Sequence, residues 1–163
     1  RGGLSQLMNA YTQQGGNLCL AVDVPPSEAR RYGILNVDPM VTPQGGGIPV
    51  RGMVEKPPAG TAPSTLAIMG RYILQPQVFD HLSAFEAGAG GEIQLTDAMA
   101  KLIGTQPFHA VRFDGTRYDC GTKLGFIETN IALALRDPEI GQDVRATLQR
   151  LATHINAGTA PPK

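Results

Sequence analysis

Tryptophan is absent from the sequence, and cysteine occurs only twice in 163 residues, as Cys19 and Cys120. Two cysteines this far apart are too few for a disulfide scaffold and lack the paired spacing of a zinc site. We therefore expect two reduced thiols, and with them a cytoplasmic location. The short supply of cysteine leaves the hydrophobic core as the source of stability.

Long apolar runs and an excess of either charge are also missing. No run approaches the roughly 20 apolar residues of a membrane-spanning helix, and no basic segment is followed by an apolar one near the start. Fourteen Lys and Arg balance fourteen Asp and Glu. No basic cluster could neutralise a row of nucleic-acid phosphates. The composition thus predicts no membrane and no nucleic-acid partner, with room for one domain.

Apolar runs with the lengths and turn signals of strands alternate with helical spacing along the chain. Strands are expected at 17–25, 33–38, 48–56 and 64–74, with a further pair around the Asp114-Gly115 turn within 108–121. Helices are expected at 76–88, 93–104, 124–134 and 140–155. The glycine-rich stretch 42–47 is interpreted as a mobile hairpin tip, because no GxxxxGK[ST] pattern follows it. This order predicts an α/β fold with a mixed sheet.

The last expected helix has a regular apolar stripe, made of Ile140, Val144, Leu148, Leu151 and Ile155. Such a stripe needs a surface to cover. Either the helix packs on its own domain, or it lies at a contact between subunits. The residues after it, 158–163, are expected to be disordered.

A carboxylate and an ammonium stand side by side in VEKPP, where Glu55 and Lys56 end an apolar run before two prolines. Successive residues of a strand point to opposite sides, so the pair can hold two different ligand groups. A carboxylate accepts hydrogen bonds from hydroxyls, and an ammonium is a compact charge suited to phosphate. The pair therefore suits a sugar phosphate, although two solvated charges at an exposed strand end would look the same.

Other polar positions allow two interpretations each. Asp119 in RYDCGTKLG is either a magnesium ligand or a cap for the helix that follows. Gly33, after Tyr32, either lets the backbone approach a ligand closely or simply starts a strand. Lys123 falls in the first turn of the next helix, where it is either solvated or drawn to an anion.

Five segments together are distinctive: YGILNVD, MVEKPP, APSTLAIMGRYIL, GAGGEIQLTDAM and RYDCGTKLGFIETNIALAL. In order and spacing they resemble the C-terminal half of the bacterial UTP–glucose-1-phosphate uridylyltransferases, also called UDP-glucose pyrophosphorylases. The resemblance runs from about residue 5 to residue 136. GGEIQLTDA with DCGTKLG is specific to that branch of the sugar nucleotidyltransferases, whereas VEKP alone also suits the thymidylyl relatives. The resemblance implies the C-terminal part of a Rossmann-like fold, followed by helices.

The resemblance also implies a reaction and residue roles. Such enzymes join glucose 1-phosphate to the α-phosphate of UTP, with Mg²⁺, and release UDP-glucose and pyrophosphate. Glu55 would accept hydrogen bonds from the glucose hydroxyls, and Lys56 would be the catalytic residue that holds the sugar-side phosphate. Gly33 would offer its backbone N–H to the sugar, and Ile68 would border the pocket through its main chain. Asp119 stands where the thymidylyl relatives have a second magnesium ligand.

The sequence departs from this family in one large respect. The nucleotide loop of the form GxGTRxxPxTK is absent, so the chain is expected to be a fragment that is inactive by itself. We expect residues 1–136 to form the sugar-binding half, 137–157 a helix that can mediate a homo-oligomer, and 158–163 the tail. A bare sheet edge is expected as another contact between copies. Thr65 replaces an asparagine common in relatives. The alternatives are a related enzyme with another nucleotide or sugar, or a non-catalytic regulatory module.

Overall fold

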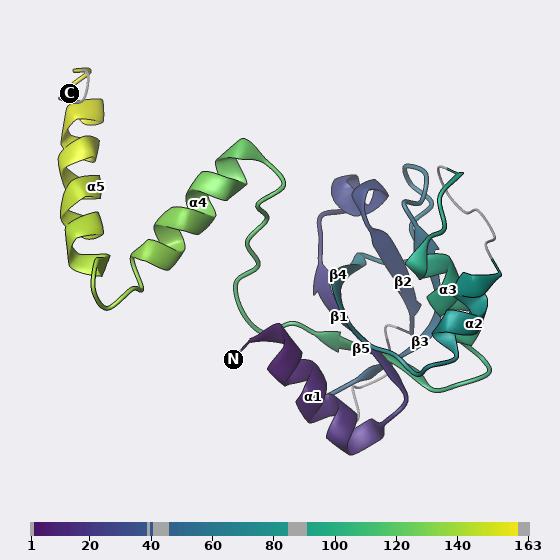
Figure 1. Ribbon diagram of the computed structural model, residues 1–163. Coiled ribbons are helices and arrows are strands. Elements are labelled where there is room, and N and C mark those ends of the chain that lie inside the picture. Colours follow the sequence, from purple (N-terminus) through teal and green to yellow (C-terminus); the bar gives the residue numbers. More distant parts are fainter. Residues whose placement is uncertain (1, 39, 41–45, 85–90, 160–163) are drawn as a thin grey trace. The chain divides into compact units, whose positions relative to one another are not determined.

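The computed structural model describes residues 2–38, 40, 46–84 and 91–159. It divides into two compact units, Arg1–Gly115 and Thr116–Lys163. The first unit contains every strand of the described chain, and the second contains two helices, which Figure 1 draws in green and yellow. This division precedes the expected boundary after residue 136, whose functional meaning stays a prediction. The predicted tail lies largely outside the described residues, as does most of the glycine-rich stretch 42–47.

Five strands make up the sheet of the first unit: β1 (Asn17–Asp23), β2 (Gly33–Val37), β3 (Ile48–Glu55), β4 (Leu66–Ile73) and β5 (Phe108–Arg112). They are hydrogen-bonded in the order β1-β4-β2-β3-β5, and β5 pairs again with β1, so that the sheet closes into the ring visible in Figure 1. The β1–β5 pair is parallel and the other pairs are antiparallel. The predicted α/β class with a mixed sheet is therefore confirmed.

Two expectations about the sheet were wrong. The expected bare edge is absent among the described strands, because the ring gives every strand two neighbours. The second strand expected after Asp114-Gly115 does not form, since residues 116–119 have no strand assignment. Both sides of β5 are already paired, with β1 and with β3, so β5 has no free edge for a hairpin partner.

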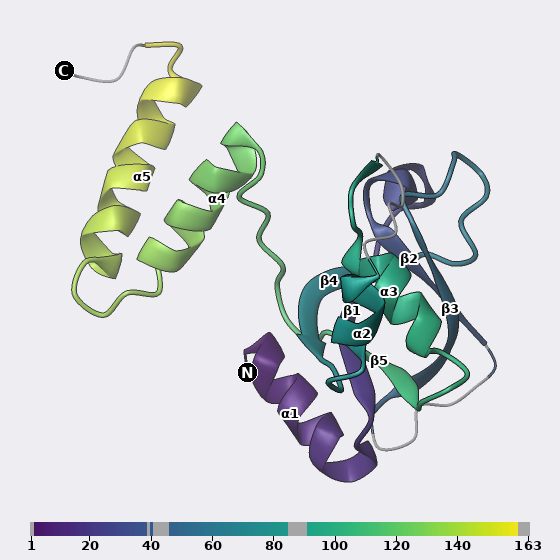
Figure 2. The same cartoon turned by 45° about the vertical axis from the view of Figure 1, so that its right-hand side comes forward.

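Helices cover both faces of the sheet. They are α1 (Gly3–Gln14), the 3₁₀ turn η1 (Pro26–Arg31), α2 (Val78–Ser83) and α3 (Leu95–Leu102). The helix α1 was not predicted, and it buries only Leu7 and Ala10 completely. α2 and α3 contact each other and lie side by side in both Figure 1 and Figure 2. The last four residues of the helix expected at 76–88 lie outside the described residues.

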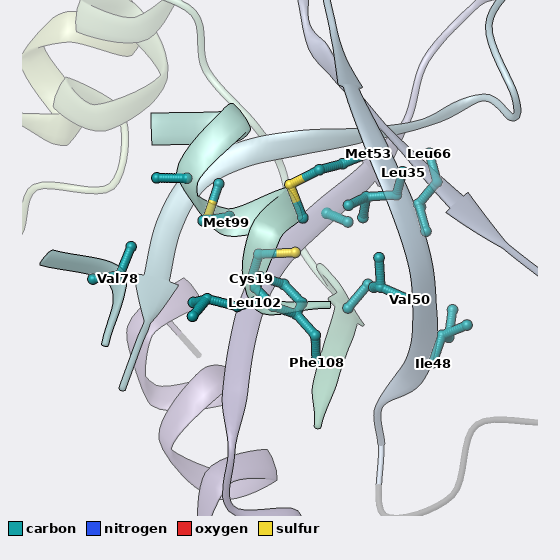
Figure 3. Packing of buried hydrophobic residues seen from close by; sticks show 13 residues of the cluster. Cys19, Leu35, Ile48, Val50, Met53, Leu66, Val78, Met99, Leu102 and Phe108 are labelled. Atoms are coloured by element: carbon teal, nitrogen blue, oxygen red, sulfur yellow. The ribbon is translucent and has the colours of Figure 1, made fainter. Parts of the chain in front are cut away.

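The alternation of β1 explains why it is apolar on both faces. Cys19 and Ala21 belong to the core cluster that α2 and α3 cover, whereas Leu18 and Leu20 pack with Leu7 of α1. Figure 3 shows the first cluster, in which side chains from the strands meet Met99 and Leu102 of α3. This packing holds α3 firmly against the sheet, and the position of α3 matters for the site.

The second unit consists of α4 (Lys123–Ala134) and α5 (Gly141–Asn156). α4 begins at the predicted place because the Thr122 side chain accepts a hydrogen bond from the backbone N–H of Gly125. Asp137 ends the first helix region as predicted, with its carboxylate accepting from the N–H groups of Glu139 and Ile140. Within the described ranges, no helix has the length and apolar character needed to cross a membrane.

Candidate functional site

The pairing of β2 with β3 brings the predicted substrate residues of the first unit together. Gly33, the first residue of β2, lies opposite Glu55, the last residue of β3. The N–H of Lys56 then donates to the carbonyl of Tyr32 over 3.1 Å, which extends the pairing by one step. Ile68 joins the group from β4, since a methyl carbon of its side chain lies 3.0 Å from where a Cβ of Gly33 would stand. Gly33, Glu55, Lys56 and Ile68 thus form one cluster, which we call the strand-end site.

The Glu55 carboxylate is held from two sides. Its Oε2 atom accepts a hydrogen bond of 2.7 Å from the Thr96 hydroxyl, and its Oε1 atom lies 3.9 Å from Nζ of Lys56. Only 13% of the Glu55 side chain is exposed, compared with 58% for Lys56. The carboxylate is therefore fixed within the site, while the ammonium extends toward solvent, where it can meet an anionic group.

The backbone of Lys56 has a conformation that its sequence position disfavours. Among the described residues other than glycine, Lys56 alone has a positive φ, 45°. A residue before proline normally stays extended, and Lys56 precedes the fully buried Pro57. Local strain of this kind costs on the order of 1–3 kcal/mol and is concentrated at functional sites. The strained turn lies within the strand-end site, directly after the buried Glu55 carboxylate.

Gly33 has no room for a side chain. A Cβ atom at this position would lie 3.0 Å from Oε2 of Glu55, 3.0 Å from a methyl carbon of Ile68 and 3.3 Å from the hydroxyl of Thr96. Contacts this short would force those three groups to move. Gly33 starts β2 and is also required by the close packing of these side chains. Its approach to a ligand stays a prediction.

Two titratable side chains of β1 and β4 stay uncharged near neutral pH. Burial raises the pKa of the Cys19 thiol to about 12. Burial also raises the pKa of Tyr72, and the negative charges of Cys19 and Glu55 raise it further, against a lowering by Arg71. Cys19 and Tyr72 therefore add no charge to the strand-end site, so that Glu55 and Lys56 set its electrostatic character.

Asp119 lies in the second unit with both carboxylate oxygens engaged. Oδ2 accepts from Arg117 over 2.9 Å, and Oδ1 accepts from the N–H of Gly121 over 2.9 Å. The cap of α4 is Thr122, so Asp119 is not the helix cap. No group of three His, Cys, Asp or Glu side chains suited to a metal occurs in the described part of the chain. Both oxygens of the Asp119 carboxylate are used by protein groups here, and its role as a magnesium ligand stays a prediction.

Sequence reasoning missed the part that Thr96 takes in the site. It placed Thr96 only within the helix expected at 93–104, and the structure has Thr96 in the first turn of α3. Forty-one residues separate Thr96 from Glu55, and no spacing rule connects them. The one signal in the sequence was the motif GGEIQLTDA, which the chain shares with the family it resembles. This motif contains Thr96 but does not indicate that Glu55 is its partner.

Comparison with known proteins decides the family. A profile described as nucleotidyl transferase matches residues 2–135. The chain belongs to the nucleotidyl transferase family. Membership agrees with the mixed α/β sheet.

Characterised members of the nucleotidyl transferase family extend the match. The UTP–glucose-1-phosphate uridylyltransferase of Staphylococcus epidermidis is 47% identical over 148 residues, which cover 91% of this chain and 50% of that protein. That of Bacillus subtilis strain 168 is 49% identical over 138 residues, covering 85% and 46%. The resemblance stated from the sequence is confirmed. The chain spans about half the length of the curated relatives it matches.

Solved structures of nucleotidyl transferases agree with the fold. A UTP-bound UGPase from Acinetobacter baumannii superimposes with a TM-score of 0.79 at 33% identity, over 93% of this chain and 51% of that one. A UDP-glucose pyrophosphorylase complexed with UDP-glucose gives 0.74 at 34% identity, over 83% and 50%. The Rossmann-like sugar nucleotidyltransferase fold expected for the chain is thereby supported by the family profile and by the structural superpositions.

Proposed function

We propose that this chain provides the sugar-phosphate side of a UTP–glucose-1-phosphate uridylyltransferase. The reaction transfers a uridylyl group from UTP to glucose 1-phosphate and yields UDP-glucose and pyrophosphate. The observation that carries the proposal is the strand-end site, in which an oriented carboxylate, an extended ammonium and a side-chain-free backbone position adjoin. The names of the curated relatives and the ligands of the solved structures support the same reaction.

Sugar recognition falls to three residues in this proposal. Glu55 accepts hydrogen bonds from glucose hydroxyls through the lone pairs that Thr96 leaves open. Gly33 presents its backbone N–H to the sugar, and it carries no side chain that would displace the Glu55 carboxylate. Ile68 borders the sugar through its main chain and packs its side chain over Gly33. The site is rigid, since each residue lies on a paired strand.

Lys56 is the catalytic residue of the proposal. In phosphoryl-type transfer the protein contributes mainly alignment of the attacking and leaving oxygens and compensation of negative charge. The exposed ammonium would hold the phosphate of glucose 1-phosphate and reduce its repulsion toward the approaching triphosphate. Because Glu55 accepts its short hydrogen bond from Thr96 and lies 3.9 Å from Nζ, the ammonium keeps its donors for phosphate oxygens.

The remainder of the proposal concerns how the metal and the nucleotide would be bound. Mg²⁺, when bound, would compensate phosphate charge, and Asp119 is the candidate ligand in this chain. Binding there would require the Asp119 carboxylate to exchange Arg117 for the ion. The 163 residues contain no GxGTRxxPxTK loop, so UTP would need groups that this sequence does not supply. We therefore expect this chain by itself to be inactive.

Cytoplasmic location and self-association complete the proposal. α5 carries the half-buried Val144, Leu148 and Leu151 and the exposed Ile155. Exposed apolar side chains on a helix favour a contact with a second copy of the chain. Light scattering over a wide concentration range tests this, and a monomer throughout would contradict it.

The proposed function is tested with the intact gene product that contains this chain. We expect it to convert UDP-glucose and pyrophosphate to UTP and glucose 1-phosphate. Lys56→Ala should lower kcat/KM by about a hundredfold or more, because an electrostatic contact to the transferring group is lost. Lys101→Ala, on the exposed surface of α3, is the matched control and should leave the rate unchanged. Glucose 1-phosphate binding without turnover would favour the regulatory alternative, and absence of both would refute the proposal.

A further inference from the structure

A threonine from outside the sheet makes the shortest polar contact of the strand-end site. The Thr96 hydroxyl donates to Oε2 of Glu55 over 2.7 Å, and Thr96 itself is only 8% exposed. A hydrogen bond to a carboxylate is stronger than one between neutral groups. The rotation of the Glu55 carboxylate is therefore fixed by α3 and not by the strand that carries Glu55.

The support behind Thr96 is rigid. α3 packs against β3 through Ala98, Met99 and Leu102, all of them buried in the core cluster drawn in Figure 3. Thr96 occupies the first turn of this helix. The hydroxyl consequently has a fixed origin in the core, and it can hold a flexible glutamate side chain in one orientation.

This orientation decides which lone pairs remain for a ligand. A carboxylate has about four acceptor positions on two oxygens. Thr96 occupies one position on Oε2, and the Lys56 ammonium faces Oε1 from 3.9 Å. On the Gly33 side Oε2 is closely packed, since even a Cβ there would lie only 3.0 Å from that oxygen. The acceptors that remain for a ligand are therefore those of Oε1 and the Oε2 position that Thr96 does not occupy.

We propose that Thr96 is a positioning residue for hexose recognition, whose hydroxyl sets the Glu55 carboxylate so that its free acceptors meet the sugar hydroxyls. The inference rests on the proposed function, because it presumes that Glu55 binds a hexose phosphate. A purely structural threonine would satisfy a partly buried carboxylate and stabilise the fold. A positioning threonine also changes affinity in a way that depends on which hydroxyls the sugar carries.

The test compares three variants in the intact protein by titration calorimetry with glucose 1-phosphate. Thr96→Val removes the hydroxyl at nearly constant volume and should weaken binding by about tenfold. Thr96→Ser restores a donor and should return the affinity to within about twofold of the wild type. Thr105→Val is the matched control, since its hydroxyl donates only to the Leu102 carbonyl at the other end of α3. It should bind like the wild type.

A deoxy-sugar series separates positioning from stability. We expect the penalty of Thr96→Val to disappear for the monodeoxyglucose 1-phosphate that lacks a hydroxyl bound by Glu55, and to persist for the others. An equal penalty across the series would overturn the inference. Wild-type affinity in Thr96→Val would overturn it as well, while leaving the proposed function intact. A wild-type protein that binds no hexose phosphate would overturn both.

A measurement on the wild type covers the case in which Thr96→Val does not fold. The Thr96 hydroxyl proton should be detectable by NMR, because it is buried and hydrogen-bonded. Its exchange with water should slow further when glucose 1-phosphate closes the site. An exchange rate that the ligand leaves unchanged would overturn the inference.

Discussion

Replacing Gly33 by alanine tests the strand-end site with the smallest available change. The substitution adds one methyl group and removes no functional side chain. Its Cβ would lie 3.0 Å from both Oε2 of Glu55 and a methyl carbon of Ile68, where ordinary contacts begin at 3.4 Å. The neighbours must therefore retreat by about 0.4 Å, the difference between these two distances. The easiest group to displace is the Glu55 carboxylate, since it ends a flexible side chain.

The expected magnitude follows from this displacement. A shift of about 1 Å at a reacting group can reduce a rate by about a hundredfold. We expect the smaller shift in Gly33→Ala to weaken glucose 1-phosphate binding by about tenfold. Overpacking usually costs about 1–3 kcal/mol of folding stability, and the movable side chains here place the cost near the lower bound. Affinity should thus change more clearly than the melting temperature.

Gly52→Ala is the matched control for this experiment. Gly52 lies in β3 as Glu55 does, and a Cβ there would meet only the Cβ of Asn36, at 3.7 Å. Both variants are titrated with glucose 1-phosphate by calorimetry and melted by circular dichroism. Gly52→Ala should bind like the wild type. If Gly33→Ala also bound with unchanged affinity while folded, the close approach at Gly33 would have no bearing on the sugar.

Four further predictions concern the strained turn, the thiols and the core. Lys56→Gly should relax the left-handed backbone and raise the melting temperature relative to Lys56→Ala, and equal values would show that φ 45° carries no strain. Cys120, which is exposed, should react with a thiol reagent at pH 8, whereas Cys19 should react only after unfolding. Because burial raises the Cys19 pKa from 9.0 to about 12, its stabilising contribution is complete below pH 9 and is lost as the pH rises toward 12. Urea denaturation from pH 8 to 11 measures that loss, and a flat profile would contradict it. Leu102→Ala should lower the free energy of unfolding by about 2–5 kcal/mol, since Leu102 is 1% exposed in the core that holds α3. A change below 1 kcal/mol by the same denaturation assay would refute that role.

Helices and strands could be predicted wherever their signal lies in consecutive residues. β1 to β4 are apolar runs closed by proline, glycine or charge, and the structure has them where expected. α4 and α5 were equally visible, because Thr122 and Asp137 mark their limits by short-range hydrogen bonds. α1 was missed since it buries few apolar residues completely, which weakens the helical signal.

The features of the fold and site that could not be predicted depend on contacts between residues far apart in the sequence. The closure of the sheet through β3 and β5 joins segments about 60 residues apart and could not be predicted from either segment. The hydrogen bond from Thr96 to Glu55 is of the same kind. The pair Glu55 and Lys56, in contrast, was recognisable from its position before two prolines, because a strand end can be identified locally.

A structure of the intact protein with bound glucose 1-phosphate tests the central claim most directly. The account predicts the hexose hydroxyls within hydrogen-bonding distance of the Glu55 carboxylate and beside Gly33, with the phosphate on the Lys56 ammonium. A hexose phosphate bound elsewhere, with residues 55 and 56 contacting only water, would contradict it.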